Sequence, residues 1–83
     1  MIPPRIRSVT ALENFCLELI YETDEKKIYD AKKLLSHPGY KNLNNIIYFK
    51  RVKSAQTTVE WPNGEDIDPN DLYENSTNVK WPK

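Results

Sequence analysis

The chain has 83 residues, of which 39% are hydrophobic and 29% charged, and its 12 basic and 12 acidic residues give a formal net charge of zero. This composition is typical of one small globular domain, and a neutral chain has no overall attraction to nucleic acid or to an anionic membrane. Cys16 is the only cysteine, which excludes an intrachain disulfide. Because no signal peptide and no run of about 20 apolar residues is found, we expect a cytoplasmic protein without a membrane partner.

The first third of the chain is predicted to form β-strands. Residues 5–9 follow two prolines, which lack an N–H donor and therefore favour the edge of a sheet. Hydrophobic residues with a period of two predict a second strand with one face inward. Its inward residues are Phe15, Leu17, Leu19 and Tyr21. A polar turn at residues 22–25 leads to a short strand over residues 26–29, which completes a hairpin.

A short helix is predicted to follow this hairpin. Asp30 is a suitable N-terminal cap, and Tyr29 is placed to pack against Leu34 across the first turn. Pro38 and Gly39 are expected to end the helix.

Residues 42–51 fit two patterns. The apolar residues at positions 43, 46 and 47 have helical spacing, whereas those from 46 to 52 also fit the alternation of a strand. We favour a short helix that gives way to a strand near Arg51.

The second half of the chain contains the clearest local signals. Residues 57–61 alternate as a strand, and the Pro62, Asn63 and Gly64 that follow predict a turn. A helix is expected to begin after Asp68, because an aspartate cap, a proline at the first helical position and an acidic residue at the third all suit a helix start. Ile67 and Leu72 are spaced to pack against each other across this start.

These elements predict an α+β fold with a small antiparallel sheet built from hairpins and two or three short helices. We place a single domain at residues 1–75 and a C-terminal extension at residues 76–83, which is either a docked strand or a flexible tail. The sequence Val-Glu-Trp-Pro at residues 59–62 is echoed by Val-Lys-Trp-Pro at residues 79–82. The two copies are candidates for neighbouring strands, with Glu60 near Lys80.

Charge is unevenly distributed along the chain. Residues 26–53 carry eight basic residues and one acidic residue, whereas residues 11–25 and 54–79 carry only acidic ones. Such asymmetry is found at interaction surfaces. The alternative is that the basic middle and the acidic flanks neutralise each other in the fold.

The chemistry of common active sites is missing from the sequence. Residues 66–71 resemble a calcium loop but lack its central glycine, and helix capping explains their acidic residues without a metal. One cysteine and one histidine cannot fill a structural zinc site, and nothing in the sequence links Cys16 to His37 as a catalytic pair. Because the only glycines are Gly39 and Gly64, a glycine-rich phosphate loop is excluded. We therefore expect no enzymatic activity, no cofactor and no metal.

One stretch resembles a known family. Residues 61–73 combine Trp-Pro-Asn-Gly with Asp-Ile-Asp-Pro and Leu-Tyr, and residues 4–6 and 12–15 are similar to the opening of the same family. On these motifs the chain resembles the domain-of-unknown-function 2442 family. The resemblance implies a small α+β fold of bacterial origin with no established activity. It also implies relatives that stand alone, are fused to a helix-turn-helix domain, or are encoded beside toxin–antitoxin-like partners.

The leading hypothesis is a small protein-interaction module, such as an accessory or antitoxin-like component, that binds a protein partner or a second copy of itself. The predicted binding residues surround the turn and the helix start; they are Trp61, Asn63, Glu65, Asp66 and Tyr73. The alternative is a nucleic-acid-associated regulator that uses the basic middle segment. Its predicted contacts are Lys26, Lys27, Lys50, Arg51 and Lys53.

Overall fold

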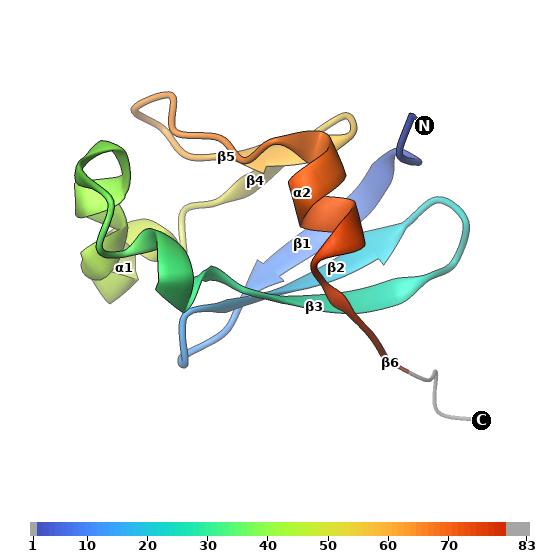
Figure 1. The fold of residues 1–83 in the computed structure, drawn as a ribbon, viewed down its shortest axis with the longest axis horizontal. Helices are drawn as coiled ribbons and strands as arrows, with labels where there is room; N and C mark the ends of the chain where they lie inside the picture. Colours follow the sequence, from blue (N-terminus) through green and yellow to red (C-terminus); the bar gives the residue numbers. More distant parts are fainter. Residues whose placement is uncertain (1, 80–83) are drawn as a thin grey trace.

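The structure is a computed structural model that describes residues 2–79. The body of the protein is a four-stranded antiparallel sheet with short helices on one side (Figure 1). Its strands lie in the order β1-β2-β3-β6 and are β1 (Ile6–Ala11), β2 (Cys16–Tyr21), β3 (Lys26–Asp30) and β6 (Thr77–Val79). A separate two-stranded sheet consists of β4 (Lys53–Ala55) and β5 (Thr58–Glu60). The short helices are the 3₁₀-helices η1 (Ala31–Leu34) and η2 (Pro38–Asn44), and the α-helices α1 (Ile46–Phe49) and α2 (Pro69–Glu74). The predicted α+β class is confirmed.

The predicted hairpin is β2 and β3. Leu17, Leu19 and Tyr21 are completely buried on the inner face of β2, as their alternation predicts. Phe15 is an exception, because it lies before the strand with a φ of 62° and is only half-buried. The chain reverses direction here, and the Phe15 N–H donates to the carbonyl of Leu12 at 3.1 Å. The prediction that Phe15 belongs to the strand is therefore wrong, although its ring does point inward and lies 5.2 Å from that of Phe49 between centroids.

The two Val-X-Trp-Pro segments are not neighbouring strands. β5 pairs with β4, whereas β6 pairs with β3 in the other sheet, with Val79 opposite Lys26. The predicted pairing of the two copies is therefore wrong, and Lys80, with the rest of the second copy beyond Val79, lies outside the described residues. Residues 77–79 are docked on the sheet as an edge strand.

In the helical middle of the chain, the predicted start of the first helix is confirmed but its predicted end is not. Asp30 caps η1, because its carboxylate accepts a hydrogen bond from the Lys32 N–H at 2.9 Å. Pro38 does not end this helix. It begins η2 instead, since a proline at the first helical position loses no hydrogen bond. The predicted change from helix to strand is confirmed, because η2 and α1 are followed by β4.

The turn and helix start of residues 61–73 form as predicted. The Gly64 N–H donates to the carbonyl of Trp61 at 2.9 Å, and the φ of 97° at Gly64 is one that glycine adopts freely. The Asp68 carboxylate accepts from the Asp71 N–H at 3.3 Å, which caps α2. Ile67 and Leu72 are buried on either side of this cap.

The hydrophobic core lies between the four-stranded sheet and a second layer made of α2 and the β4–β5 hairpin, while η2 and α1 close one end (Figure 1). Its largest fully buried side chains are Trp61, Tyr21, Tyr29, Phe49, Leu17, Leu19, Leu43, Ile67, Leu72 and Val59. These come from both layers and from the helical end, so the layers share one core.

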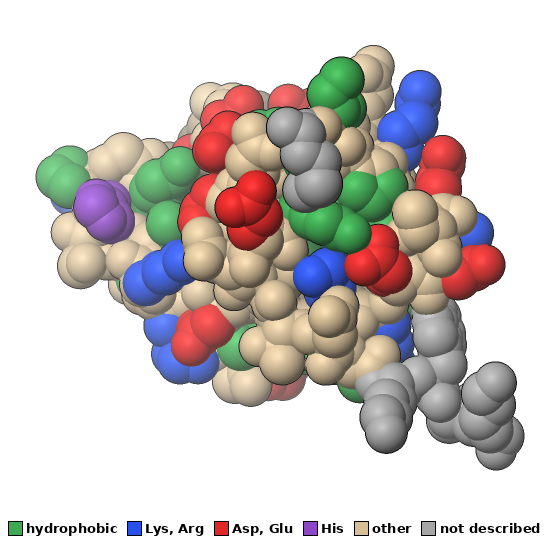
Figure 2. All heavy atoms as spheres, turned by 45° about the vertical axis from the view of Figure 1, so that its right-hand side comes forward, with side chains coloured by type: hydrophobic (Ala, Val, Ile, Leu, Met, Phe, Trp, Pro, Cys, Tyr) green, Lys and Arg blue, Asp and Glu red, His purple; other side chains and the backbone are tan. Residues whose placement is uncertain are grey.

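Most of the uneven charge of the sequence is neutralised in the fold. Basic residues of the middle segment pair with acidic residues from both flanks. The pairs are Lys26–Glu18, Lys50–Glu13, Lys33–Asp71 and Lys53–Glu60. Figure 2 shows acidic and basic side chains intermixed on one face. Each exposed pair contributes at most about 1 kcal/mol, but together they leave few unpaired charges on the middle segment.

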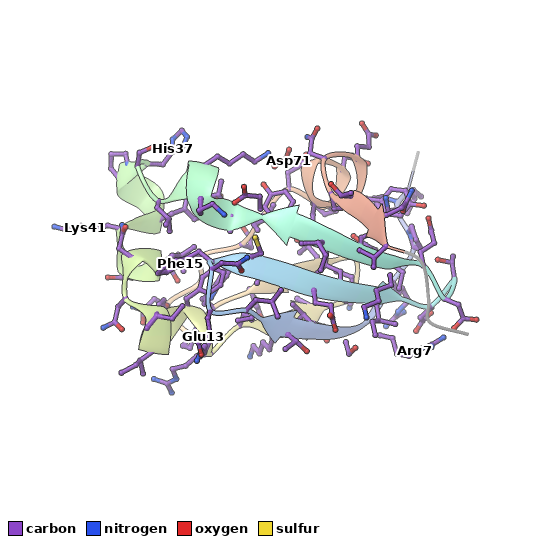
Figure 3. All side chains as sticks on the ribbon, turned by 90° about the horizontal axis from the view of Figure 1, so that it is seen from below. Arg7, Glu13, Phe15, His37, Lys41 and Asp71 are labelled. Atoms are coloured by element: carbon purple, nitrogen blue, oxygen red, sulfur yellow. The ribbon has the colours of Figure 1, made fainter. Side chains whose placement is uncertain are left out.

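The outer face of the four-stranded sheet carries no helix within the described chain (Figure 3). Ile20 and Ile28 are half-buried there, and an ion pair of 3.6 Å joins Lys26 to Glu18 between adjacent strands. The candidate interaction surface lies elsewhere, at the helical end.

Candidate interaction surface

Trp61 is a core residue rather than a surface residue. Its side chain is 1% exposed, and the indole Nε1–H donates to the carbonyl of Phe49 at 2.9 Å. The Phe49 and Trp61 rings lie 5.8 Å apart between centroids. Trp61 therefore fixes the position of the following turn but is not accessible to a partner.

Asn63 lies on the wall of an open hollow between this turn and the helical end of the molecule. The hollow, of about 610 Å³, is lined by Lys41, Asn42, Asn44, Asn45, Tyr48 and Asn63. We call it the asparagine hollow. Its residues come from η2, α1 and the turn after β5, and all except Tyr48 are exposed.

Glu65 joins the two sides of the asparagine hollow. One of its carboxylate oxygens accepts from the Tyr48 hydroxyl at 2.6 Å and the other from the Asn42 Nδ2 at 3.1 Å. The Tyr48 oxygen in turn accepts from the Asn63 N–H at 2.9 Å. Partial burial opposes ionisation of Glu65, but the hydrogen bonds from Tyr48 and Asn42 prevail and lower its pKa. Glu65 is thus a charged group that ties together two residues of the wall, Tyr48 and Asn42.

Asp66 and Tyr73, the other predicted binding residues, do not reach the hollow's wall. Asp66 is exposed, and its backbone carbonyl accepts from the Tyr40 hydroxyl at 2.8 Å. Tyr73 lies on α2, where its hydroxyl donates to Glu25 at 2.7 Å. Its ring packs edge-on against Tyr21 and lies 4.5 Å from the Lys27 ammonium. Tyr73 therefore belongs to a different part of the structure, where it holds α2 against the hairpin.

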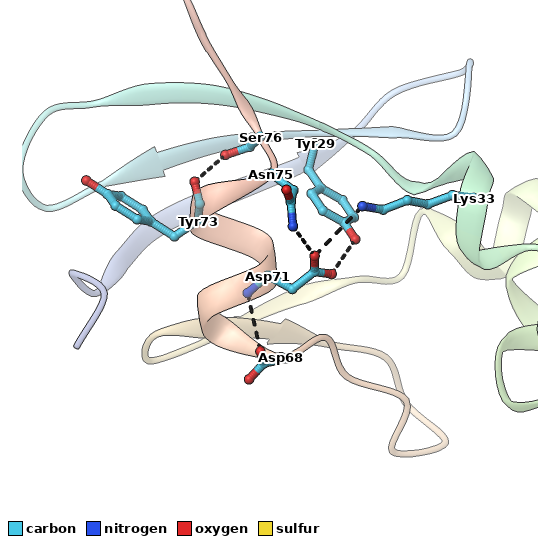
Figure 4. Close-up of polar contacts among 7 residues, drawn as sticks. All are labelled: Tyr29, Lys33, Asp68, Asp71, Tyr73, Asn75 and Ser76. Carbon is cyan, nitrogen blue, oxygen red and sulfur yellow. Dashed lines mark hydrogen bonds and ion pairs between the residues drawn. The ribbon is translucent and has the colours of Figure 1, made fainter. Parts of the chain in front are cut away.

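A second polar cluster on α2 surrounds Asp71 (Figure 4). Its carboxylate accepts from the Tyr29 hydroxyl at 2.9 Å and from Asn75, and lies 3.8 Å from the Lys33 ammonium. Partial burial opposes ionisation, but the hydrogen bonds from Asn75 and Tyr29 and the charge of Lys33 lower the pKa of Asp71. Figure 4 shows Tyr73 pointing away from this cluster. The cluster ties α2 to β3 and η1.

The residues predicted for nucleic-acid binding are mostly occupied by contacts within the protein. Lys26, Lys50 and Lys53 each form an ion pair. Lys27 is only 6% exposed. Arg51 is exposed and has no ion pair within residues 2–79. The five residues therefore offer one unpaired exposed cation, which is a poor match to a phosphate backbone.

A metal-binding cluster is not formed by the described residues. Within residues 2–79, no three His, Cys, Asp or Glu side chains are grouped to hold a metal ion. Cys16 is buried beside Lys32, with 3.8 Å between the ammonium and the sulfur, while His37 faces the ring of Tyr40. No helix in this part of the chain is long and apolar enough to cross a membrane.

Sequence reasoning found Asn63 and Glu65 but missed most of the hollow. The missed residues are Lys41, Asn42, Asn44, Asn45 and Tyr48. A usable signal was present, because three asparagines within residues 42–45 surround a single apolar residue, Leu43, which is fully buried. A short polar run fixed by one buried side chain presents its remaining side chains outward.

The fold and this surface define a small α+β domain whose most distinctive exposed feature is a polar hollow. The profile of the domain-of-unknown-function 2442 family matches residues 6–78, and the chain belongs to that family. Comparisons with curated proteins and with solved structures found no significant match.

Proposed function

We propose that this domain is a non-enzymatic, cytoplasmic protein-interaction module, an accessory or antitoxin-like component of a bacterial gene pair, and that its asparagine hollow meets the partner. The observation that carries the proposal is that an exposed apolar side chain, that of Ile47, lies beside this hollow. Ile47 lies on α1 between the hollow-lining Asn45 and Tyr48, and its side chain is 73% exposed. An apolar side chain beside a rim of amides is the usual composition of a protein-binding surface.

Two further features support a binding role. Residues beneath the surface are tightly packed, since Leu43 and Phe49 are completely buried, so the surface is held in a fixed shape. The family resemblance implies relatives encoded beside toxin–antitoxin-like partners. A nucleic-acid role receives no such support, because the predicted basic contacts are largely paired within the protein.

The experiment is co-expression of the tagged domain with the product of its neighbouring gene, followed by size-exclusion chromatography. Ile47→Asp should abolish the complex, since it places a charge at the centre of the contact. The matched control is Ile2→Asp, because Ile2 is 88% exposed and lies at the start of the described residues, away from α1. Both variants should keep the wild-type circular dichroism spectrum. Absence of a complex with the wild-type domain, or equal loss with both variants, would refute the proposal.

A further inference from the structure

Three asparagine side chains of the asparagine hollow, those of Asn42, Asn44 and Asn45, are held by hydrogen bonds within the protein. Asn44 Nδ2 donates to the carbonyls of Leu35 and Lys41, at 3.0 and 3.3 Å. Asn42 Nδ2 donates to Glu65 at 3.1 Å. Asn45 Oδ1 accepts from the Ile47 N–H at 2.9 Å. Each asparagine side chain offers both a donor and an acceptor, so each of these bonds occupies one half and leaves the other.

The side-chain amide groups that remain free include both hydrogen-bond donors and acceptors. Asn42 and Asn44 retain their carbonyl oxygens as acceptors, while Asn45 retains its NH₂ group as a donor. No side-chain hydrogen bond holds Asn63 within residues 2–79, and it can supply either group. A mixed set of amide donors and acceptors matches the peptide group, which carries one N–H and one C=O per residue. An extended peptide presents these groups in alternation along its edges.

The accessible charge at the hollow is positive. The Lys41 ammonium is exposed and has no ion pair or hydrogen bond within the described residues, and Figure 3 shows it projecting from the helical end. Glu65, the carboxylate in the wall, has both oxygens occupied by Tyr48 and Asn42. A ligand here meets the Lys41 ammonium and neutral amides.

We propose, building on the protein-binding function above, that the asparagine hollow binds an extended acidic peptide segment of the partner. The free halves of Asn42, Asn45 and Asn63 pair with the peptide backbone. Lys41 contacts a carboxylate of the peptide. Ile47, which lies beside the hollow, contacts an apolar side chain of the same segment.

The test uses three pools of capped decapeptides that differ at two central positions only, which hold glutamate, glutamine or lysine, with alanine, serine and leucine elsewhere. Binding is followed by ¹⁵N NMR, because side-chain NH₂ signals report directly on asparagines. The glutamate pool should shift the NH₂ signals of Asn45 and Asn63. Its affinity should fall as the salt concentration is raised. The glutamine pool should bind at least tenfold more weakly, and the lysine pool should not bind.

Variants locate the binding. Asn63→Asp adds a negative charge to the wall, and Lys41→Gln removes the exposed cation. Each variant should weaken binding of the glutamate pool by about threefold to fivefold, the range expected for an exposed charge contact. Asn70→Asp is the matched control, because Asn70 is an exposed asparagine on α2 outside the hollow, and it should leave binding unchanged.

Several results would overturn the inference. These are no binding of the glutamate pool, equal binding of the glutamine pool, insensitivity to Asn63→Asp, or tighter binding of a ten-nucleotide oligothymidylate. The proposed function is tested separately, by size-exclusion chromatography of the complex with the whole partner. A complex that forms and depends on Ile47, with no peptide bound at the hollow, would reject the peptide while keeping the interaction module.

Discussion

Replacing Trp61 with phenylalanine separates a core role from a binding role. The substitution removes the indole N–H that donates to the carbonyl of Phe49, a buried hydrogen bond of 2.9 Å. That carbonyl also accepts from the Val52 N–H at 3.4 Å, so it is not left without a partner and the loss is about 1 kcal/mol. The smaller ring leaves a cavity of about 40 Å³, which at about 24 cal/mol per Å³ adds about 1 kcal/mol. With lost packing against Phe49, we expect destabilisation of about 2–3 kcal/mol.

This loss is large for a domain of 83 residues, whose total stability is about 4–12 kcal/mol. Urea unfolding followed by circular dichroism should show the midpoint fall by about 2 M, at a slope of about 1 kcal/mol per M. The control is Asn63→Ala in the same turn, which is exposed and should change stability by less than about 0.5 kcal/mol. If Trp61→Phe left the urea midpoint unchanged, Trp61 would not be the core residue described above and would return to the list of partner contacts.

Three further predictions concern caps, turns and pH. Asp68→Ala removes the oxygen that accepts from the Asp71 N–H and should cost about 1 kcal/mol; an unchanged melting temperature would contradict the cap. Gln56→Gly should stabilise the β4–β5 hairpin by about 0.5–1 kcal/mol, because Gln56 has a φ of 60°, and a lower melting temperature would contradict this. The pKa of Asp71 is lower in the folded protein, so its stabilisation is complete above the ordinary carboxyl pKa of about 4 and is lost as the pH falls through the lower folded value. Asp71→Asn should therefore reduce the fall in urea midpoint between about pH 5 and pH 2, whereas an identical slope would show that Asp71 contributes nothing to it.

Local patterns in the sequence were sufficient to predict strands and helix starts whose structure depends on neighbouring residues. The alternation that ends at Tyr21 produced a buried strand face, and the caps at Asp30 and Asp68 begin helices as expected. Their errors are also local in origin. Phe15 continued the alternation in sequence but occupies a turn, and Pro38 carried both a stop and a start signal for a helix.

Long-range contacts explain what the sequence could not supply. The pairing of β6 with β3 joins residues about 50 positions apart, and similarity between two segments does not determine which strand each one joins. The asparagine hollow has the same origin. Its walls are joined by residues far apart in the sequence, such as Tyr48 and Glu65, which are 17 positions apart and share a hydrogen bond. Trp61, in contrast, looked like a surface residue because it lies beside the exposed Asn63.

The asparagine hollow has a consequence for how such domains diversify. Two of its exposed residues, Lys41 and Asn63, have no side-chain hydrogen bond or ion pair within residues 2–79, while the buried Leu43 and Phe49 hold the backbone in place. Substitutions at Lys41 and Asn63 are therefore nearly neutral for folding. Copies of this domain with different side chains at these positions would keep the same fold while presenting different hydrogen-bonding groups and charges.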